Sequence, residues 1–289
     1  MERTLKVPSC LEANCATSAE RRAWLQHLPE IVAQLEERWS LTIGPPFDGS
    51  EVSCAWVAPV QLRGNTAAVI KIGMPHFEGV QEIDGLLFWN GDVTVRLLDC
   101  DVHLGAMLLE RCEPGTHLRV LPEVDQDVVI AGLLKRLWQA RGAPPFRPLA
   151  ALVERWTEET VSQMADWPDA ALVRQGLDLW SELVRSTGRE VPLASDLHAG
   201  NVLRAQRRPW LVIDPKPLVG DAAYDTTQHL LNCIDRLRSD FKGTVDRFAD
   251  LLELDQERIR LWTFARLAAE PRHRWKNDTG FELARMIAP

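Results

Sequence analysis

The sequence predicts an α+β protein with a β-rich N-terminal part and a mainly helical C-terminal part. Three observations lead to this class. Strand-like runs separated by turn residues dominate the chain before Pro114. Beyond Pro114, apolar residues recur at the three-to-four spacing of amphipathic helices. No internal repeat is visible in the sequence, so a repeat architecture is not expected.

The N-terminal part is expected to begin with a helix after an irregular start. Apolar residues from Trp24 to Trp39 follow helical spacing, and Ser18 is a suitable N-terminal cap. Pro29 either kinks this helix or starts a second segment. Strand character then recurs on both sides of a short helix expected at 76–89. The expected strands are 41–43, 52–60, 66–72, 94–98 and 106–110.

The C-terminal part is predicted to consist of helices interrupted by one β-hairpin at about 201–214. The expected helices are 123–139, 149–165, 169–186, 222–238, 244–253 and 256–269. Because strands dominate the first part and helices the second, we expect an N-terminal lobe over residues 1–111 and a helical lobe over 112–289.

Composition and charge exclude several classes of protein. Net charge is −8 and no basic segment is present that would follow a phosphate backbone, so nucleic acid is not an expected partner. The sequence has neither an apolar run of about 18 residues nor the pattern of a signal peptide, so we expect a cytoplasmic protein with no membrane partner. The cysteines are scattered without metal-binding spacing and are expected to be free thiols. No protein partner is evident.

Asp196, Asn201 and Asp214 form the pattern with the clearest chemical meaning. Asn201 starts one strand-like run and Asp214 follows another. If the two runs pair as a hairpin, Asn201 lies across from Asp214 at its open end, where an amide oxygen and a carboxylate can share a magnesium ion. Asp196, on the loop that enters this end, can accept the proton of an attacking hydroxyl. Phosphoryl transfer needs such a base and such metal ligands, so the pattern indicates this reaction. The alternative interpretation is that the three residues only cap turns or end strands.

Lys71 interrupts an apolar run over residues 67–72. A lysine in the middle of such a strand is unfavourable unless it is paired. Either Lys71 lies on an edge strand and points to solvent, or it is a kinase-type lysine that reaches nucleotide phosphates and is held by a glutamate. Glu78 and Glu82 lie on one face of the helix expected next, and their spacing alone does not choose between them.

Several segments carry a family resemblance: AVIKIG, QEIDGLLFWNG, VRLLD, AMLLERCEPGTHLR, SDLHAGNVL, WLVIDPKPLVGDAAYD and HLLNCIDR. In these segments, from about Trp39 to Arg236, the chain resembles the streptomycin 6-kinases and hydroxyurea phosphotransferases of the aminoglycoside-phosphotransferase family. The resemblance implies a bilobal protein-kinase-like fold in which residues 1–111 bind the nucleotide. It also implies ATP and Mg²⁺ as cofactors, and an enzyme that phosphorylates a hydroxyl of a small molecule in antibiotic resistance.

The resemblance assigns Asp196 as the catalytic base, with Asn201 and Asp214 as magnesium ligands. The sequence departs from the family in one place. Where the family usually has His-Gly before the catalytic Asp, this chain has Ala194-Ser195. That His generally braces the loop, so the order of the loop and the turnover rate are in question.

The resemblance also implies residues that bind the nucleotide. Glu82 matches the position that pairs with Lys71, which would contact the phosphates. Glu110 and Arg111 fall on the hinge, where backbone atoms would hydrogen-bond adenine.

Further candidates lie near the acceptor. His198 either contacts substrate or metal or, as we favour, braces the loop by hydrogen bonding. Asp221 and Asp225 follow the metal segment, where carboxylates can pair with cationic groups of a streptomycin-like acceptor. For Asp225 we favour a cap of the helix that follows.

Two alternative functions stay open. The first is a catalytically weak, nucleotide-binding homologue of these kinases, which the replaced His-Gly would favour. The second is a kinase for another antibiotic or for a polyhydroxylated metabolite, because the acceptor is not fixed by the fold.

Overall fold

The computed structural model describes residues 5–49, 54–186, 188–271 and 279–289, and the chain divides into two compact units. The first unit is Met1–Thr116 together with Leu203–Ile213, and the second is His117–Val202 together with Asp214–Pro289. The chain thus returns once to the first unit, through a segment that the predicted division at residue 111 does not include.

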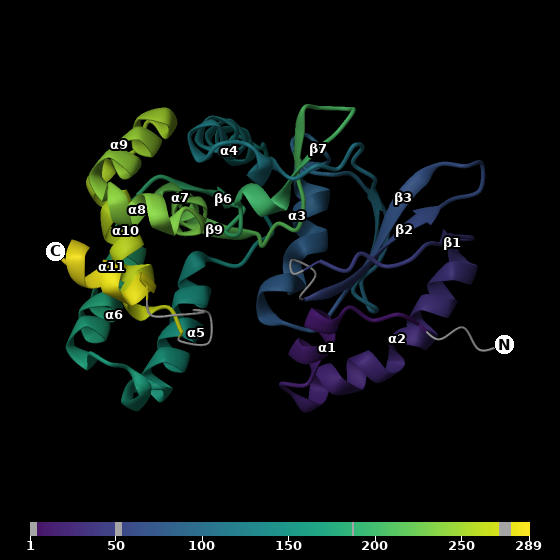
Figure 1. Cartoon of the computed structure of the whole chain (residues 1–289), viewed down its shortest axis with the longest axis horizontal. Coiled ribbons are helices and arrows are strands. Elements are labelled where there is room, and N and C mark those ends of the chain that lie inside the picture. Colours follow the sequence, from purple (N-terminus) through teal and green to yellow (C-terminus); the bar gives the residue numbers. More distant parts are fainter. Residues whose placement is uncertain (1–4, 50–53, 187, 272–278) are drawn as a thin grey trace. The chain divides into compact units, whose positions relative to one another are not determined.

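The first unit is built on a five-stranded antiparallel sheet (Figure 1). The strands are β1 (Thr42–Ile43), β2 (Ala55–Gln61), β3 (Ala67–Gly73), β4 (Leu97–Asp101) and β5 (Ala106–Glu110). Their order is β1-β2-β3-β5-β4, so β3 is the central strand. Gly64 and Asn65, with φ of 89° and 65°, supply the left-handed turn between β2 and β3. The helices are α1 (Ser9–Cys15), α2 (Ala19–Arg38), η1 (Phe77–Gln81) and α3 (Glu82–Trp89).

The sheet separates two apolar cores, because successive strand residues point to opposite faces. Ile70 and Ile72 of β3 belong to the core that also contains buried residues of α1 and α2. Val69 packs against the other core, which contains Ile83 and Leu86 of α3. The alternation therefore places Lys71 on the α3 face of the central strand.

The hairpin of β7 (Val202–Arg204) and β8 (Trp210–Val212) contributes Leu211 to the α3-side core. Arg207, in the turn between β7 and β8, donates to Glu110 Oε2 at 2.9 Å. It also donates to the carbonyls of Gly91 and Thr94, at 2.6 and 2.9 Å. Burial alone would raise the pKa of Glu110, but the bonds from Arg207 and Arg96 outweigh it and hold this pKa below its ordinary value. One arginine thus fixes the hairpin to the end of β5.

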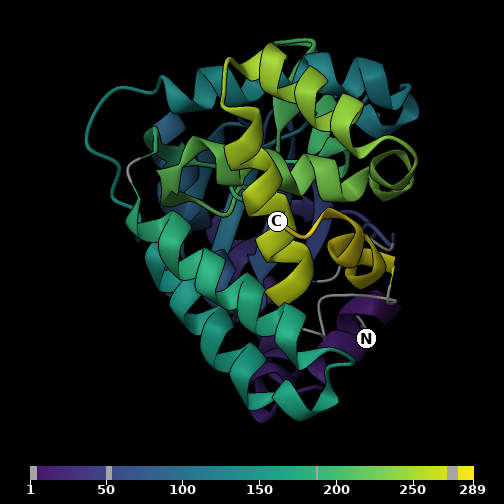
Figure 2. The same cartoon turned by 90° about the vertical axis from the view of Figure 1, so that its left-hand side faces the viewer.

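The second unit is mainly helical (Figure 2). Its helices are η2 (Leu118–Val120), α4 (Glu123–Trp138), α5 (Leu149–Ser162), η3 (Met164–Asp166), α6 (Ala170–Arg185), η4 (Ala199–Asn201), α7 (Ala222–Asn232), α8 (Ile234–Ser239), α9 (Phe241–Leu252), α10 (Gln256–Ala269) and α11 (Thr279–Ile287). The teal helices α5 and α6 lie side by side in both views. Strands β6 (Glu190–Leu193) and β9 (Leu218–Asp221) pair antiparallel.

Helix α10 is the core of this unit, since every residue from Trp262 to Ala269 is buried. It packs against α6, α7, α9 and α11. Gly176 of α6 permits the close approach, because a Cβ at this position would lie 2.8 Å from the Cβ of Ala268.

The α+β class is confirmed, and several predicted elements need correction. The predicted strand 94–98 is shifted, because β4 begins at Leu97 and Thr94 instead forms an isolated bridge with Val212. The predicted helix 222–238 is two helices that separate at Cys233. Pro29 lies inside α2 without ending it. The sequence pattern also missed α1, α11, β6 and β9.

The predicted cap of α2 agrees with the structure, whereas part of one predicted strand lies outside the described residues. The Oγ of Ser18 accepts the Arg21 N–H at 3.2 Å, which confirms the predicted cap of α2. The start of the predicted strand 52–60 falls on residues that the structure does not describe. Within the described ranges, no helix is both long and apolar enough to cross a membrane.

Candidate active site

The loop that carries Asp196 leaves β6 through a strained turn. Ser195 has a φ of 57°, a left-handed conformation that costs an L-residue about 1–2 kcal/mol. The N–H groups of Ala194 and Ser195 donate to the Asp225 carboxylate at 3.0 and 2.7 Å. The Ala194 carbonyl accepts the N–H of Lys216 at 2.9 Å. Backbone hydrogen bonds therefore hold the turn in place.

Asp225 is the anchor of this turn and does not cap α7. It lies inside the helix, is 0% exposed, and accepts a third hydrogen bond from Trp138 Nε1 at 2.9 Å. Burial raises the pKa of Asp225, although its three donors favour the ionised form. The prediction that it caps α7 is wrong, because that cap is Asp221, whose Oδ1 accepts the Ala223 N–H at 3.0 Å.

Asp221 also has its partners inside the second unit. Its Oδ2 accepts from Trp262 Nε1 at 2.6 Å and forms an ion pair with Arg258. Both Asp221 and Asp225 are thus committed to contacts within the protein. These contacts disfavour a pairing of either carboxylate with a cationic acceptor.

The carboxylate of Asp196 lies between two side-chain amides. Gln228 Nε2 donates to its Oδ1 at 2.7 Å. Asn201 Nδ2 lies 3.4 Å from its Oδ2 and donates to the Asp196 main-chain carbonyl at 3.0 Å.

Asn201 and Asp214, the predicted magnesium ligands, carry an amide and a carboxylate that could each supply an oxygen to the ion. Asn201 ends η4, and its Nδ2 bonds to Asp196 leave the amide oxygen as the ligand atom. Asp214 follows β8 with a φ of 53°, and its Oδ1 forms an ion pair with Lys216, so a cation already lies against this carboxylate. Among the described residues, no group of three or more His, Cys, Asp or Glu could hold a metal. An oxygen-only donor set with few protein ligands suits magnesium.

His198 braces the catalytic loop. Its Nδ1 accepts the N–H of Gly200 at 3.1 Å, at the start of η4. Burial, assisted by the charge of Arg119, lowers the pKa of His198 to about 4. The imidazole is therefore neutral at neutral pH and acts as a hydrogen-bond acceptor.

Lys71 and Glu82 form a buried ion pair in the first unit. Lys71 is 8% exposed on the central strand, which excludes the solvent-facing edge position. Its Nζ donates to the two carboxylate oxygens of Glu82 at 2.6 and 2.7 Å. The side chain of Glu78 lies outside the described part of the structure.

Glu110 and Arg111 end the strand β5 and begin the segment after it. The Glu110 N–H donates to the Arg96 carbonyl at 2.9 Å. Arg111 Nε lies 3.6 Å from Glu113 Oε1. Their proposed contact with adenine stays a prediction.

Gln228 and Lys216 were not singled out from the sequence. Gln228 follows Asp225 by one helical turn, so the two residues share a face of α7. This spacing would have placed Gln228 near the catalytic loop if the contact of Asp225 with that loop had been known. Lys216 stands beside Asp214 in sequence, but charge alone does not distinguish it from a surface lysine.

Solved structures and sequence relatives define the class of protein. A choline kinase from Streptococcus pneumoniae has the same fold, with a TM-score of 0.63 and 14% identity over 90% of this chain and 97% of that one. A spectinomycin phosphotransferase superposes with a TM-score of 0.53 and 13% identity, over 90% of this chain and 94% of that one. These similarities confirm the kinase-like α+β fold of two lobes.

The family follows from the sequence. Residues 38–279 match the family described as aminoglycoside/hydroxyurea antibiotic resistance kinase, and the chain belongs to this family. It is 38% identical to a streptomycin 6-kinase from Streptomyces griseus, over 91% of this chain and 89% of the relative. It is 37% identical to a hydroxyurea phosphotransferase from Kitasatospora aureofaciens, over 86% of this chain and 74% of the relative. The protein is therefore a small-molecule kinase that uses a nucleotide and a hydroxyl acceptor.

Proposed function

We propose that this enzyme transfers the γ-phosphoryl group of ATP to a hydroxyl of a streptomycin-like aminoglycoside, with magnesium as cofactor. The observation that carries the proposal is the Asp196 carboxylate, held between the amides of Gln228 and Asn201 on a fixed loop. The streptomycin 6-kinase relatives support the choice of acceptor.

Asp196 is proposed as the general base. The acceptor oxygen attacks the γ-phosphorus as its O–H bond breaks, and the proton moves to the Asp196 carboxylate. The bond between the γ-phosphorus and the bridging oxygen breaks, and ADP leaves with that electron pair. The loop bonds of Ala194 and Ser195 keep the base in place, so the protein contributes mainly position and charge.

Asn201 and Asp214 are proposed to hold magnesium, and Lys71 to contact the phosphates of ATP. Bound magnesium would offset negative charge on the phosphate oxygens. Glu82 fixes the Lys71 ammonium through two hydrogen bonds, so its position does not depend on the nucleotide. Glu110 and Arg111 are proposed to contact adenine through the backbone. A location in the cytoplasm, where ATP is available, agrees with this chemistry.

Hydroxyurea is a second candidate acceptor, because a hydroxyurea phosphotransferase is 37% identical to this chain. The buried positions of Asp221 and Asp225 remove one argument for a cationic acceptor, so the choice depends on measurement. The intact loop contacts around Asp196 disfavour a catalytically weak homologue.

Acceptor-dependent release of ADP from Mg-ATP tests the proposal. Purified enzyme is assayed with streptomycin, with hydroxyurea and with an uncharged sugar alcohol, and the products are identified by mass spectrometry. We expect one phosphoryl group on streptomycin and little turnover of the sugar alcohol. Phosphorylation of hydroxyurea alone would replace the acceptor class, and no acceptor-dependent ADP release from any compound would refute the proposal.

Variants of the proposed site test the roles. Removing a general base typically lowers the rate by about 10²–10⁴-fold, so Asp196→Ala should lose most turnover while it still binds ATP. Asp214→Ala should weaken Mg-ATP binding as well as the rate, since a metal ligand is lost. Activity of Asp196→Ala within about threefold of wild type contradicts the assignment of the base.

A further inference from the structure

One side-chain contact of the proposed base comes from α7, a helix outside the loop that carries Asp196. Gln228 Nε2 lies 2.7 Å from Asp196 Oδ1, whereas Asn201 Nδ2 lies 3.4 Å from Oδ2. Gln228 belongs to α7 and is only partly buried. Of these two amides, Gln228 makes the closer contact with the carboxylate.

The orientation of the Gln228 amide is fixed by its second contact. Arg266 Nη2 lies 2.9 Å from the Gln228 Oε1. A guanidinium has only donors, so its partner atom must be the amide oxygen. The amide NH₂ group is therefore the one that faces Asp196, and Gln228 can only donate to the carboxylate.

Arg266 is itself immobilised in α10. It is 3% exposed, donates to Thr227 Oγ1 at 2.8 Å, and lies 3.2 Å from both carboxylate oxygens of Glu270. The guanidinium carbon of Arg266 lies 5.2 Å from the centre of the Tyr224 ring. Tyr224 belongs to α7, the helix that carries Gln228. The amide of Gln228 is thus held by a group with little freedom to move.

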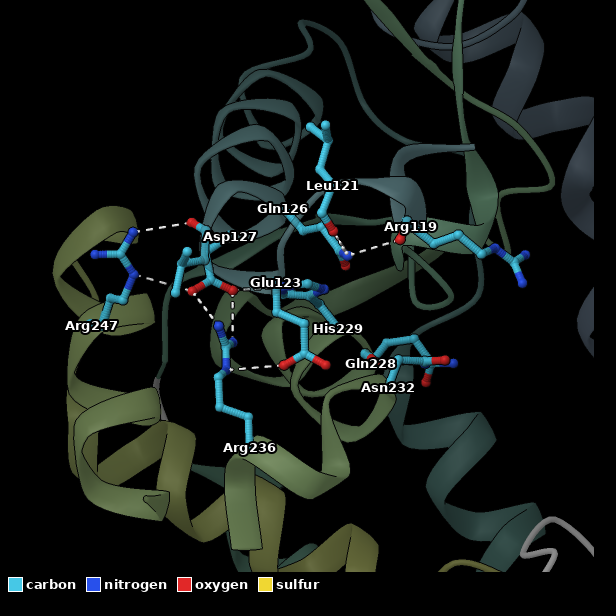
Figure 3. A network of polar contacts seen from close by, with 11 residues as sticks. Arg119, Leu121, Glu123, Gln126, Asp127, Gln228, His229, Asn232, Arg236 and Arg247 are labelled. Atoms are coloured by element: carbon cyan, nitrogen blue, oxygen red, sulfur yellow. Dashed lines mark hydrogen bonds and ion pairs between the residues drawn. The ribbon is translucent and has the colours of Figure 1, made fainter. Parts of the chain in front are cut away.

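Helix α7 is anchored from its other side by the buried carboxylate of Asp127 on α4 (Figure 3). His229 Nε2 lies 2.8 Å from Asp127 Oδ1, and Arg236 and Arg247 contact the same carboxylate at 2.8 and 3.2 Å. Because His229 is the next residue after Gln228, this cluster fixes the backbone that carries the glutamine. Two separate sets of contacts therefore determine where the Gln228 amide lies.

We propose that Gln228 is a positioning residue for phosphoryl transfer: it holds the Asp196 carboxylate in one rotamer. The proposal rests on the assignment of Asp196 as the base. Because the NH₂ group of Gln228 faces Asp196, the amide can only donate there and does not take up the proton of the acceptor.

Two substitutions separate this role from a structural one. Gln228→Met removes the donor at similar volume. Gln228→Glu keeps an oxygen for Arg266 but places a second carboxylate against Asp196. Asn232→Ala is the matched control, because Asn232 lies beside Gln228 in Figure 3 and donates only to the main-chain carbonyl of Gln228, at 2.8 Å. All variants are compared with wild type and Asp196→Ala, with thermal unfolding measured in parallel.

We expect kcat of Gln228→Met to fall about 10- to 100-fold, as for the loss of a hydrogen bond to a charged group, with both KM values within about twofold of wild type. Gln228→Glu should lose more activity, since two carboxylates share one site. Asn232→Ala should match wild type.

The outcomes separate this proposal from the assignment of the base. If Gln228→Met matches Asn232→Ala in kcat while Asp196→Ala is inactive, Gln228 has no positioning role although Asp196 remains the base. A decrease in unfolding temperature without a change in kcat also excludes a positioning role. If Asp196→Ala retains activity, the base is misassigned, and the role of Gln228 is refuted with it.

Discussion

Ser195 combines a left-handed backbone, with φ of 57°, and a buried hydroxyl that has no hydrogen-bond partner among the described residues. Both features oppose folding. Glycine adopts the left-handed backbone without the steric cost and has no hydroxyl to bury. Ser195→Gly keeps the backbone N–H that donates to Asp225 at 2.7 Å. The substitution should therefore stabilise the protein without loosening the catalytic loop.

The expected gain follows from three contributions. The left-handed conformation costs an L-residue about 1–2 kcal/mol. A buried hydroxyl without a partner costs about 1–3 kcal/mol. Glycine loses more backbone freedom on folding, which offsets about 0.5–1 kcal/mol. The net increase in the free energy of unfolding is about 3 kcal/mol, or an increase in Tm of about 5 °C for a chain of 289 residues.

Thermal and urea unfolding measure this difference, with Ser40→Gly as the matched control. Ser40 also has a positive φ, of 52°, and lies at the end of α2. Its hydroxyl is not among the buried groups without a partner, so Ser40→Gly should gain less, about 1 kcal/mol or below. A destabilised Ser195→Gly variant, or gains of equal size in both, would refute the reasoning from the buried hydroxyl.

Three further perturbations have defined outcomes. Lys71→Met removes the ammonium from the buried Glu82 carboxylate, so it should cost about 3–5 kcal/mol in urea unfolding. Adding Glu82→Gln should restore stability but not the kcat/KM for ATP, which should stay about 10- to 100-fold low. Asp127→Asn should cost about 3–5 kcal/mol, because the fully buried Asp127 carboxylate is the shared partner of His229, Arg236 and Arg247. Asp92→Asn, in an exposed pair, should cost below about 1 kcal/mol. Burial lowers the pKa of His198 to about 4, whereas the unfolded chain takes up this proton at about pH 6.5. The free energy of unfolding should therefore fall as the pH decreases from about 6.5 to 4. In urea unfolding across this pH range, His198→Asn should remove up to about 3 kcal/mol of that fall.

Much of the first unit could be predicted because its strands follow local rules. The turn at Gly64 and Asn65 has residues that accept positive φ, and the alternating pattern of β3 fixes which side chains share a face. The same alternation places Lys71 on the α3 face, where Glu82 begins the next helix. The position of β4 was wrong because its pairing with β5 contains an irregularity between Leu97 and Asp99, which has no signal in the local sequence.

The second unit was less predictable, because its key contacts join residues that lie far apart in the chain. Asp225 looked like a helix cap, since Asp is common at that position. The structure instead uses it to bind the backbone of Ala194 and Ser195. Gln228 had no distinguishing pattern, because its role depends on Arg266, which lies on a different helix. Spacing along one helix identifies a shared face, but it does not say what that face contacts.

The replacement of the usual His-Gly by Ala194-Ser195 raised the question of whether the catalytic loop is ordered. The structure supplies the bracing through other atoms. The carbonyl of Ala194 accepts the N–H of Lys216 at 2.9 Å and that of Asp196 at 2.7 Å, while its own N–H donates to Asp225. These bonds use the backbone, so they tolerate the loss of a histidine side chain at position 194. Because the loop is joined in this way to the segment that follows Asp214, the departure from the family pattern gives no reason to expect an inactive enzyme.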